Sequence, residues 1–332
     1  MRRSKLLKAI GIAMTFTCIF LFFNSFTNVD FSELGHLPRI ELLAVATMAA
    51  MTYAGLLVSV GVGFAALVQS TGYPMATAQE GIALWGRANI AKYLPGNVMH
   101  FAGRQLLAKR FNWPQAGTSS ASVLELALQV LISCSIGMAG LLMIDRMNPD
   151  LGSFWLIAAL LLSTMVLGVA LLGRLPLAGL PELPRRLLTA ASLSDLRAFS
   201  RSTLLYAAFF LGYGLVGWLV YSWLIGAAEL PLLPGVAAIV LLSWCAGLVV
   251  PGAPGGIGVR EATMVLLGAP FLDHDSLVLT AIMLRVISLA GEGLMFALAC
   301  HLPRHPPTSA VGLHRPSRAG MGPQSSSNRS TA

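Results

Sequence analysis

Long runs of apolar residues dominate the chain, and polar residues are confined to short segments between them. A helix needs about 20 apolar residues to cross the hydrocarbon core of a bilayer. Six runs of this order predict full membrane-spanning helices. They cover residues 9–26, 42–68, 119–144, 151–172, 203–225 and 276–302.

Two further apolar segments, 78–110 and 232–272, are interrupted by proline and glycine. The first breaks at 94–97 and the second at 250–258. Proline ends the helical hydrogen-bond ladder, and glycine lets the backbone turn tightly. We interpret each segment as a re-entrant hairpin of two short helices. Residues 230–250 are nevertheless long enough to cross by themselves, so six to eight spans agree with the pattern.

The composition supports a membrane protein. Of the 332 residues, 56% are hydrophobic and only 11% are charged, whereas soluble proteins carry about 25% charged residues. This excludes an ordinary soluble enzyme, a disordered protein and a disulfide-built module. We predict an all-α polytopic protein with one transmembrane domain over 1–302. Residues 303–332 are rich in Pro, Ser, Gly and Arg, which predicts a disordered, basic cytoplasmic tail.

The basic residues are distributed unevenly among the connecting segments. With the N-terminus inside, 18 of the 22 lysines and arginines fall on the inner side, as the positive-inside rule requires. An even number of crossings then keeps the basic tail inside. We therefore expect a multi-pass protein of a bacterial cell (inner) membrane with both termini cytoplasmic.

The order span, hairpin, span occurs twice, over residues 42–144 and 203–302. Under the predicted sidedness the two units have opposite orientations. Interrupted helices at matching places in two inverted units are typical of transporters that bind substrate near the bilayer midplane. The alternative is that two Pro-Gly breaks arose at similar places by coincidence.

The residues around both breaks resemble signatures of a known family. These are Lys92-Tyr93-Leu94-Pro95-Gly96-Asn97, followed by Arg104, and Pro254-Gly255-Gly256-Ile257-Gly258-Val259-Arg260-Glu261. They resemble the lysylphosphatidylglycerol synthase transmembrane-region family of flippase-like integral membrane proteins. In its large members a cytosolic domain transfers an aminoacyl group to lipid, and the membrane region moves the product between leaflets. The resemblance implies a stand-alone member without that synthase domain.

Three ionisable residues lie within predicted spans: Glu125, Arg285 and Glu292. Charges at membrane depth are costly, which makes each a functional candidate. Arg285 and Glu292 are two helical turns apart and share a face. The alternatives are a buried structural pairing for these two residues and an interfacial position for Glu125.

Cations and free backbone amides beside a broken helix suit a lipid phosphate. Arg260 and Glu261 follow the second break, and Glu261 either neutralises Arg260 or favours the start of the next helix. The alternatives are headgroup-level anchoring at the first break and a purely structural turn at the second. The complete predicted lipid or anion site comprises Lys92, Asn97, Arg104, Gly255, Gly256, Gly258, Arg260 and Glu261.

These features predict a non-enzymatic translocator of lipids or lipid-linked sugars, with no cofactor, metal site or catalytic residue. Its expected partners are membrane lipids, either anionic or linked to polyprenyl phosphate, and a glycosyltransferase or synthase, but not nucleic acid. One alternative is an accessory subunit of a glycolipid or polyprenyl-phosphate-sugar assembly system. Another is an integral membrane glycosyl- or acyltransferase that uses Asp30 and Glu33.

Overall fold

The computed structural model describes residues 39–93, 99–145, 195–227, 229–250 and 253–302, and all regular structure within these ranges is helical. Four helices are long: α2 (Arg39–Ser70), α5 (Gln115–Asp145), α8 (Leu196–Leu224) and α11 (His274–His301). Four are shorter: α3 (Ala78–Asn89), α4 (Met99–Arg110), α9 (Leu233–Val249) and α10 (Val259–Gly268). Short 3₁₀ turns are η2 (Ile90–Tyr93), η3 (Leu230–Leu232) and η4 (Pro254–Gly256).

Five helical segments are long and apolar enough to cross a membrane: Arg39–Ser70, Gln115–Met143, Leu196–Leu224, Leu230–Val249 and His274–His301. Four of them coincide with the predicted spans at 42–68, 119–144, 203–225 and 276–302 and confirm that these runs are helical. The fifth lies in the segment that we interpreted as the first arm of a hairpin. The spans predicted at 9–26 and 151–172, and the tail at 303–332, lie outside the described residues.

The second predicted interruption is present, whereas the first, at 94–97, lies outside the described residues. In the first segment, α3 continues into η2, and a new helix, α4, begins at Met99. In the second, α9 ends at Val249, and η4 separates it from α10. Gly255, Gly256 and Gly258 all have positive φ angles, which glycine adopts without the steric cost that other residues incur. The glycine run therefore turns the chain into α10.

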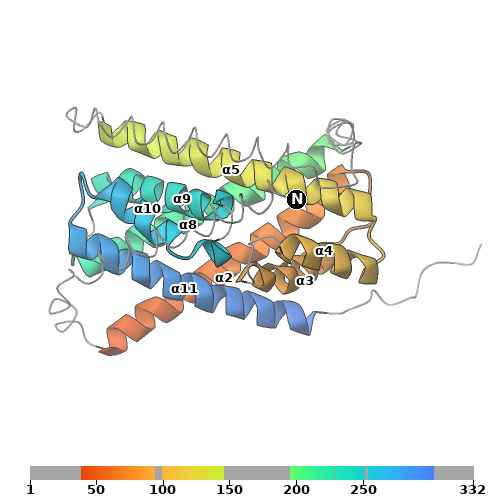
Figure 1. Cartoon of the computed structure of the whole chain (residues 1–332), viewed down its shortest axis with the longest axis horizontal. Coiled ribbons are helices and arrows are strands. Elements are labelled where there is room, and N and C mark those ends of the chain that lie inside the picture. Colours follow the sequence, from red (N-terminus) through yellow and green to blue (C-terminus); the bar gives the residue numbers. More distant parts are fainter. Residues whose placement is uncertain (1–38, 94–98, 146–194, 228, 251–252, 303–332) are drawn as a thin grey trace, which may run out of the picture.

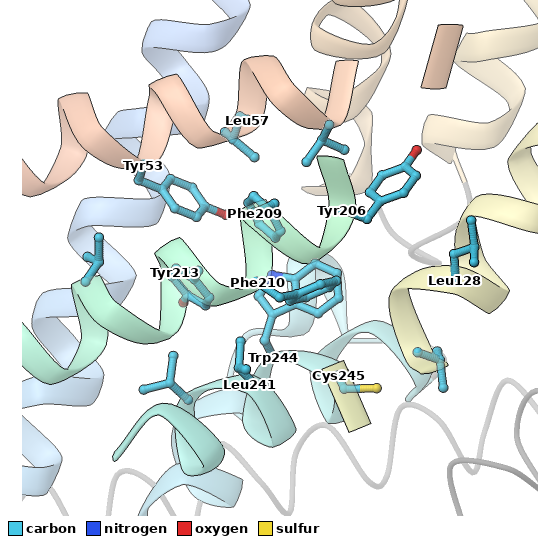
Figure 2. Close-up of a cluster of buried hydrophobic side chains, with 14 of the residues drawn as sticks. Tyr53, Leu57, Leu128, Tyr206, Phe209, Phe210, Tyr213, Leu241, Trp244 and Cys245 are labelled. Carbon is cyan, nitrogen blue, oxygen red and sulfur yellow. The ribbon is translucent and has the colours of Figure 1, made fainter. Parts of the chain in front are cut away.

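Aromatic side chains form the centre of the bundle where α2, α8 and α9 meet (Figure 2). The ring of Tyr53 on α2 lies 5.2 Å from the ring of Tyr213 on α8, measured between centroids. Phe210 on α8 packs edge-on against Trp244 on α9 at 5.0 Å. Large rings packed in this way stabilise contacts between neighbouring helices.

The outer surface of the bundle is apolar. Large hydrophobic side chains are more than half exposed on α2, α5 and α8, including Leu43, Met48, Leu131, Leu204 and Leu211. Exposed apolar patches of this kind mark contact with a membrane or another protein. Together with the length of the helices, this surface is that of a membrane protein.

The long helices run in two opposite directions along the bundle (Figure 1). Helices α2 and α11 run one way along the bundle, and α5 and α8 run the other way. The contacts between helices also have a regular pattern. If α2 is exchanged with α8, α3 with α9, α4 with α10 and α5 with α11, the set of major helix–helix contacts stays the same. For example, the packing of α5 on α9 matches that of α11 on α3.

Candidate functional site

A cavity of about 50 Å³ lies where the two interrupted segments approach the centre of the bundle. Its basic lining comes from both segments: Lys92 on η2, Arg104 on α4 and Arg260 on α10. The remaining walls are mainly aromatic and polar, with His100, Asn89, Gln129, Tyr53, Trp85, Phe209 and Trp244 among them. No acidic residue lines this cavity within the described ranges.

Arg104 is held by a fully buried network. Its guanidinium forms an ion pair with Glu125 of α5, and the two side chains are only 3% and 2% exposed. The indole Nε1 of Trp85 donates to Glu125 Oε1 at 2.7 Å, and the Gln129 amide donates to the same oxygen at 3.3 Å. Because three donors converge on one carboxylate, Glu125 fixes α3, α4 and α5 relative to one another.

Lys92 is held by Glu292 of α11. The Lys92 Nζ lies 2.5 Å from Glu292 Oε1, and the hydroxyl of Tyr93 donates to Glu292 Oε2 at 2.8 Å. Glu292 is 2% exposed, whereas Lys92 is 14% exposed. A buried carboxylate on one long helix thus anchors the end of the first interrupted segment.

The second interrupted segment is attached to α11 through Arg285. The Arg285 guanidinium donates to the carbonyl oxygen of Gly255 at 3.1 Å and lies 3.6 Å from Glu261 Oε1. Glu261 Oε2 accepts a hydrogen bond from the backbone N–H of Gly258 at 2.8 Å. A carboxylate at this position satisfies a free amide of the first turn and is favoured by the helix dipole. Glu261 itself therefore occupies the amide that we expected to be available to an external anion.

Arg260 differs from the other three cations. It has no hydrogen bond or ion pair to any described residue, and its guanidinium lies over the ring of Trp244, 5.3 Å from the centroid. A Cβ on Gly247 would clash with the Arg260 side chain, and one on Gly256 would lie 2.9 Å from Arg260 Nε. The two glycines therefore provide the space in which Arg260 lies beside the cavity.

Several buried nitrogens at the site have no hydrogen-bond partner among the described residues. They include Nε of Arg104, Nε of Arg260, Nη2 of Arg285 and Nδ1 of His100. A buried donor without an acceptor costs about 1–3 kcal/mol, and more if it is charged. Unpaired cationic donors beside a cavity that lacks acidic walls are suited to an anionic ligand.

The structure brings together most of the residues singled out from the sequence. Glu125 is buried and paired with Arg104, and Arg285 and Glu292 each contact a different interrupted segment instead of each other. Glu261 pairs with Arg285, not with Arg260. Asn97 lies outside the described residues.

Sequence reasoning missed Trp85, Gln129 and Trp244, which complete the site. Gln129 had a recognisable signal, because it lies one helical turn after Glu125 and therefore on the same face of its helix. Trp85 and Trp244 had none, since a tryptophan within an apolar helix usually contributes to the core.

Comparison of the chain with protein-family models, curated proteins and solved structures gave no match. Within the described ranges, no group of three or more His, Cys, Asp or Glu residues is placed to hold a metal ion. The interpretation of the site consequently rests on its own geometry.

Proposed function

We propose that this membrane protein binds the anionic headgroup of a lipid in the cavity between its two interrupted segments and moves that lipid between leaflets. The observation that carries the proposal is the convergence of Lys92, Arg104 and Arg260 on a cavity with no acidic lining residue among the described ranges. Arginine donors bind phosphate strongly when water is excluded. A phosphate would supply the acceptors that the buried guanidinium nitrogens lack.

We further propose that residues 42–144 and 203–302 form an inverted repeat with two re-entrant hairpins. The opposite directions of α2 and α8, and of α5 and α11, support this arrangement (Figure 1). The exchange of equivalent helix–helix contacts supports it independently. In such proteins one unit moves against the other around a fixed central site, which alternately exposes that site to each side.

The remaining expectations form part of the same proposal. The charge distribution favours an inner bacterial membrane with cytoplasmic termini, and the motifs at the breaks favour the flippase-like family that they resemble. Asp30 and Glu33, which the transferase alternative would use, lie outside the described residues. We propose a non-enzymatic carrier because the three carboxylates at the described site, Glu125, Glu261 and Glu292, are each already paired with a cation.

Reconstitution into liposomes tests the proposal. Fluorescent phosphatidylglycerol in the inner leaflet becomes accessible to dithionite when it is carried outward. We expect wild-type protein to accelerate this exposure and Arg260→Gln to slow it at least about tenfold. Lys109→Gln is the matched control, since Lys109 is an exposed cation at the end of α4. Equal rates with and without wild-type protein, for phosphatidylglycerol and for polyprenyl phosphates, would contradict transport and favour an accessory role.

A further inference from the structure

The buried charges around the cavity are not balanced. Four cations converge there, namely Lys92, Arg104, Arg260 and Arg285, and three carboxylates accompany them: Glu125, Glu261 and Glu292. The described part of the site therefore carries a formal excess of one positive charge. His100 adds no charge when neutral, and its Nδ1 has no partner among the described residues.

The excess can be assigned to one residue. Each carboxylate belongs to a different cation: Glu125 to Arg104, Glu292 to Lys92 and Glu261 to Arg285. Among the described residues, Arg260 forms no ion pair: its guanidinium lies over the ring of Trp244, and Glu292, which is paired with Lys92, acts on it only at longer range. A cation–π contact contributes less than the burial of one ion costs.

Charge neutrality in a low-dielectric site then constrains the ligand. One negative charge would neutralise the cluster, whereas a second would leave an uncompensated anion, and uncompensated buried charge is strongly unfavourable. A zwitterion would supply the phosphate but would also bring an ammonium close to Lys92 and Arg104. The repulsion between these like charges is large where water is excluded.

From this balance we infer that the cavity selects a phosphodiester with a single negative charge over a phosphomonoester or a zwitterionic headgroup, and that Arg260 determines this selectivity. The inference rests on the proposed function, because it takes the ligand to be a lipid. It extends that function by assigning the ligand's chemical class and the residue that recognises it.

A binding panel tests the inference. Purified full-length protein in neutral detergent is titrated at pH 8 with short-chain phosphatidylglycerol, phosphatidic acid or phosphatidylethanolamine, and bound lipid is counted by native mass spectrometry. At this pH a phosphomonoester carries close to two negative charges, because its second pKa is about 6. We expect phosphatidylglycerol to bind at least about tenfold more tightly than either of the other lipids.

Changing the charge of the site should change this order. Arg260→Gln removes the excess and should weaken phosphatidylglycerol binding at least about tenfold, while Lys109→Gln should leave it unchanged. Glu125→Gln and Glu292→Gln each raise the excess to two positive charges and should shift the preference toward phosphatidic acid. Two variants on different helices are used because either substitution by itself could disturb the fold.

The failures of the two claims can be distinguished. If none of the lipids binds wild-type protein, the proposed function fails. If phosphatidic acid binds as tightly as phosphatidylglycerol to wild-type protein, or Arg260→Gln retains the wild-type order, the charge inference is overturned while lipid binding stands. Equally tight binding of water-soluble glycerophosphoglycerol would support the phosphodiester chemistry and contradict a lipid source.

Discussion

The two interrupted segments are attached to the bundle by ion pairs of opposite polarity. In the first, the cation Arg104 lies on the short helix α4 and the carboxylate Glu125 on the long helix α5. In the second, the carboxylate Glu261 lies on α10 and the cation Arg285 on α11. Each segment is thus joined to a long helix by one ion pair, and the cation and the carboxylate have exchanged places between the two pairs. Glu261 accepts a hydrogen bond from the backbone N–H of Gly258 and pairs with Arg285. It therefore does not pair with Arg260, which remains available to a ligand.

The two links also differ in tightness. Arg104 and Glu125 are at most 3% exposed and share their network with Trp85 and Gln129. Arg285 is 14% exposed and lies 3.6 Å from Glu261. A buried, multiply bonded pair is costly to break, whereas a looser and more accessible pair can exchange partners at lower cost. We infer that the first segment is the fixed side of the site and the second is the adjustable side.

The largest expected effect comes from removing a carboxylate on the fixed side. Glu125→Ala leaves Arg104 buried without its counter-charge and should lower the free energy of unfolding by about 3–5 kcal/mol. Glu261→Ala should cost less, because Arg285 keeps its bond to the Gly255 carbonyl and has some access to solvent. Unfolding in mixed micelles measures both values. Equal losses for the two variants would remove the distinction between a fixed and an adjustable side.

An intermediate effect is expected where the two segments touch. Gly255 has φ = +59°, and a Cβ there would meet the ring of Tyr93. Gly226 has a similar φ of +67°, and a Cβ added to it would have nothing within 4 Å. Gly226→Ala should therefore show only the left-handed backbone cost of about 1–2 kcal/mol. Gly255→Ala should exceed it because Tyr93 must also move.

The matched glycine pair isolates the contact between the segments. Thermal unfolding of the two variants in the same detergent gives the difference directly. Gly255→Ala should also reduce lipid transport, which Gly226→Ala should not. Indistinguishable stability and transport in the two variants would mean that the approach of Tyr93 to Gly255 has no role.

The smallest effect is expected outside the site, at the exposed N-terminus of α11. The backbone N–H of Ser276 donates to Asp273 at 2.9 Å and lowers the pKa of its carboxyl. Asp273→Ala should cost about 1 kcal/mol, whereas Asp273→Asn retains an acceptor and should cost little.

The pH dependence of this contact has a defined sign. Because the folded-state pKa of Asp273 is lowered, its contribution is present at neutral pH. It declines as the pH falls below the ordinary aspartate value of about 4. Wild-type protein should therefore lose its advantage over Asp273→Ala on acidification. An advantage that persists unchanged to the lowest accessible pH would show that the charge at Asp273 is irrelevant.

The sequence predicted the four long helices of the described ranges and the break between α9 and α10, because each depends on local chemistry. Apolar runs of sufficient length form long helices, and the cluster of proline and glycine at 250–258 interrupts them, although single glycines such as Gly61 lie inside a helix. The charged residues were also identifiable, since they are rare within such runs. Their partners were not, because pairing depends on how helices pack sideways. Arg285 and Glu292 share a face of α11, yet they contact different interrupted segments, which hydropathy and spacing do not encode.

The central claim is that a lipid headgroup binds between the two interrupted segments, and photolabelling tests it most directly. Phosphatidylglycerol with a photoreactive diazirine beside its phosphate is reconstituted with the protein, irradiated and mapped by mass spectrometry. The account predicts labels on residues around Lys92, Arg104 and Arg260 that excess unlabelled phosphatidylglycerol removes. Labels restricted to the exposed outer surface, such as Leu43 and Leu204, and unaffected by competitor would contradict it.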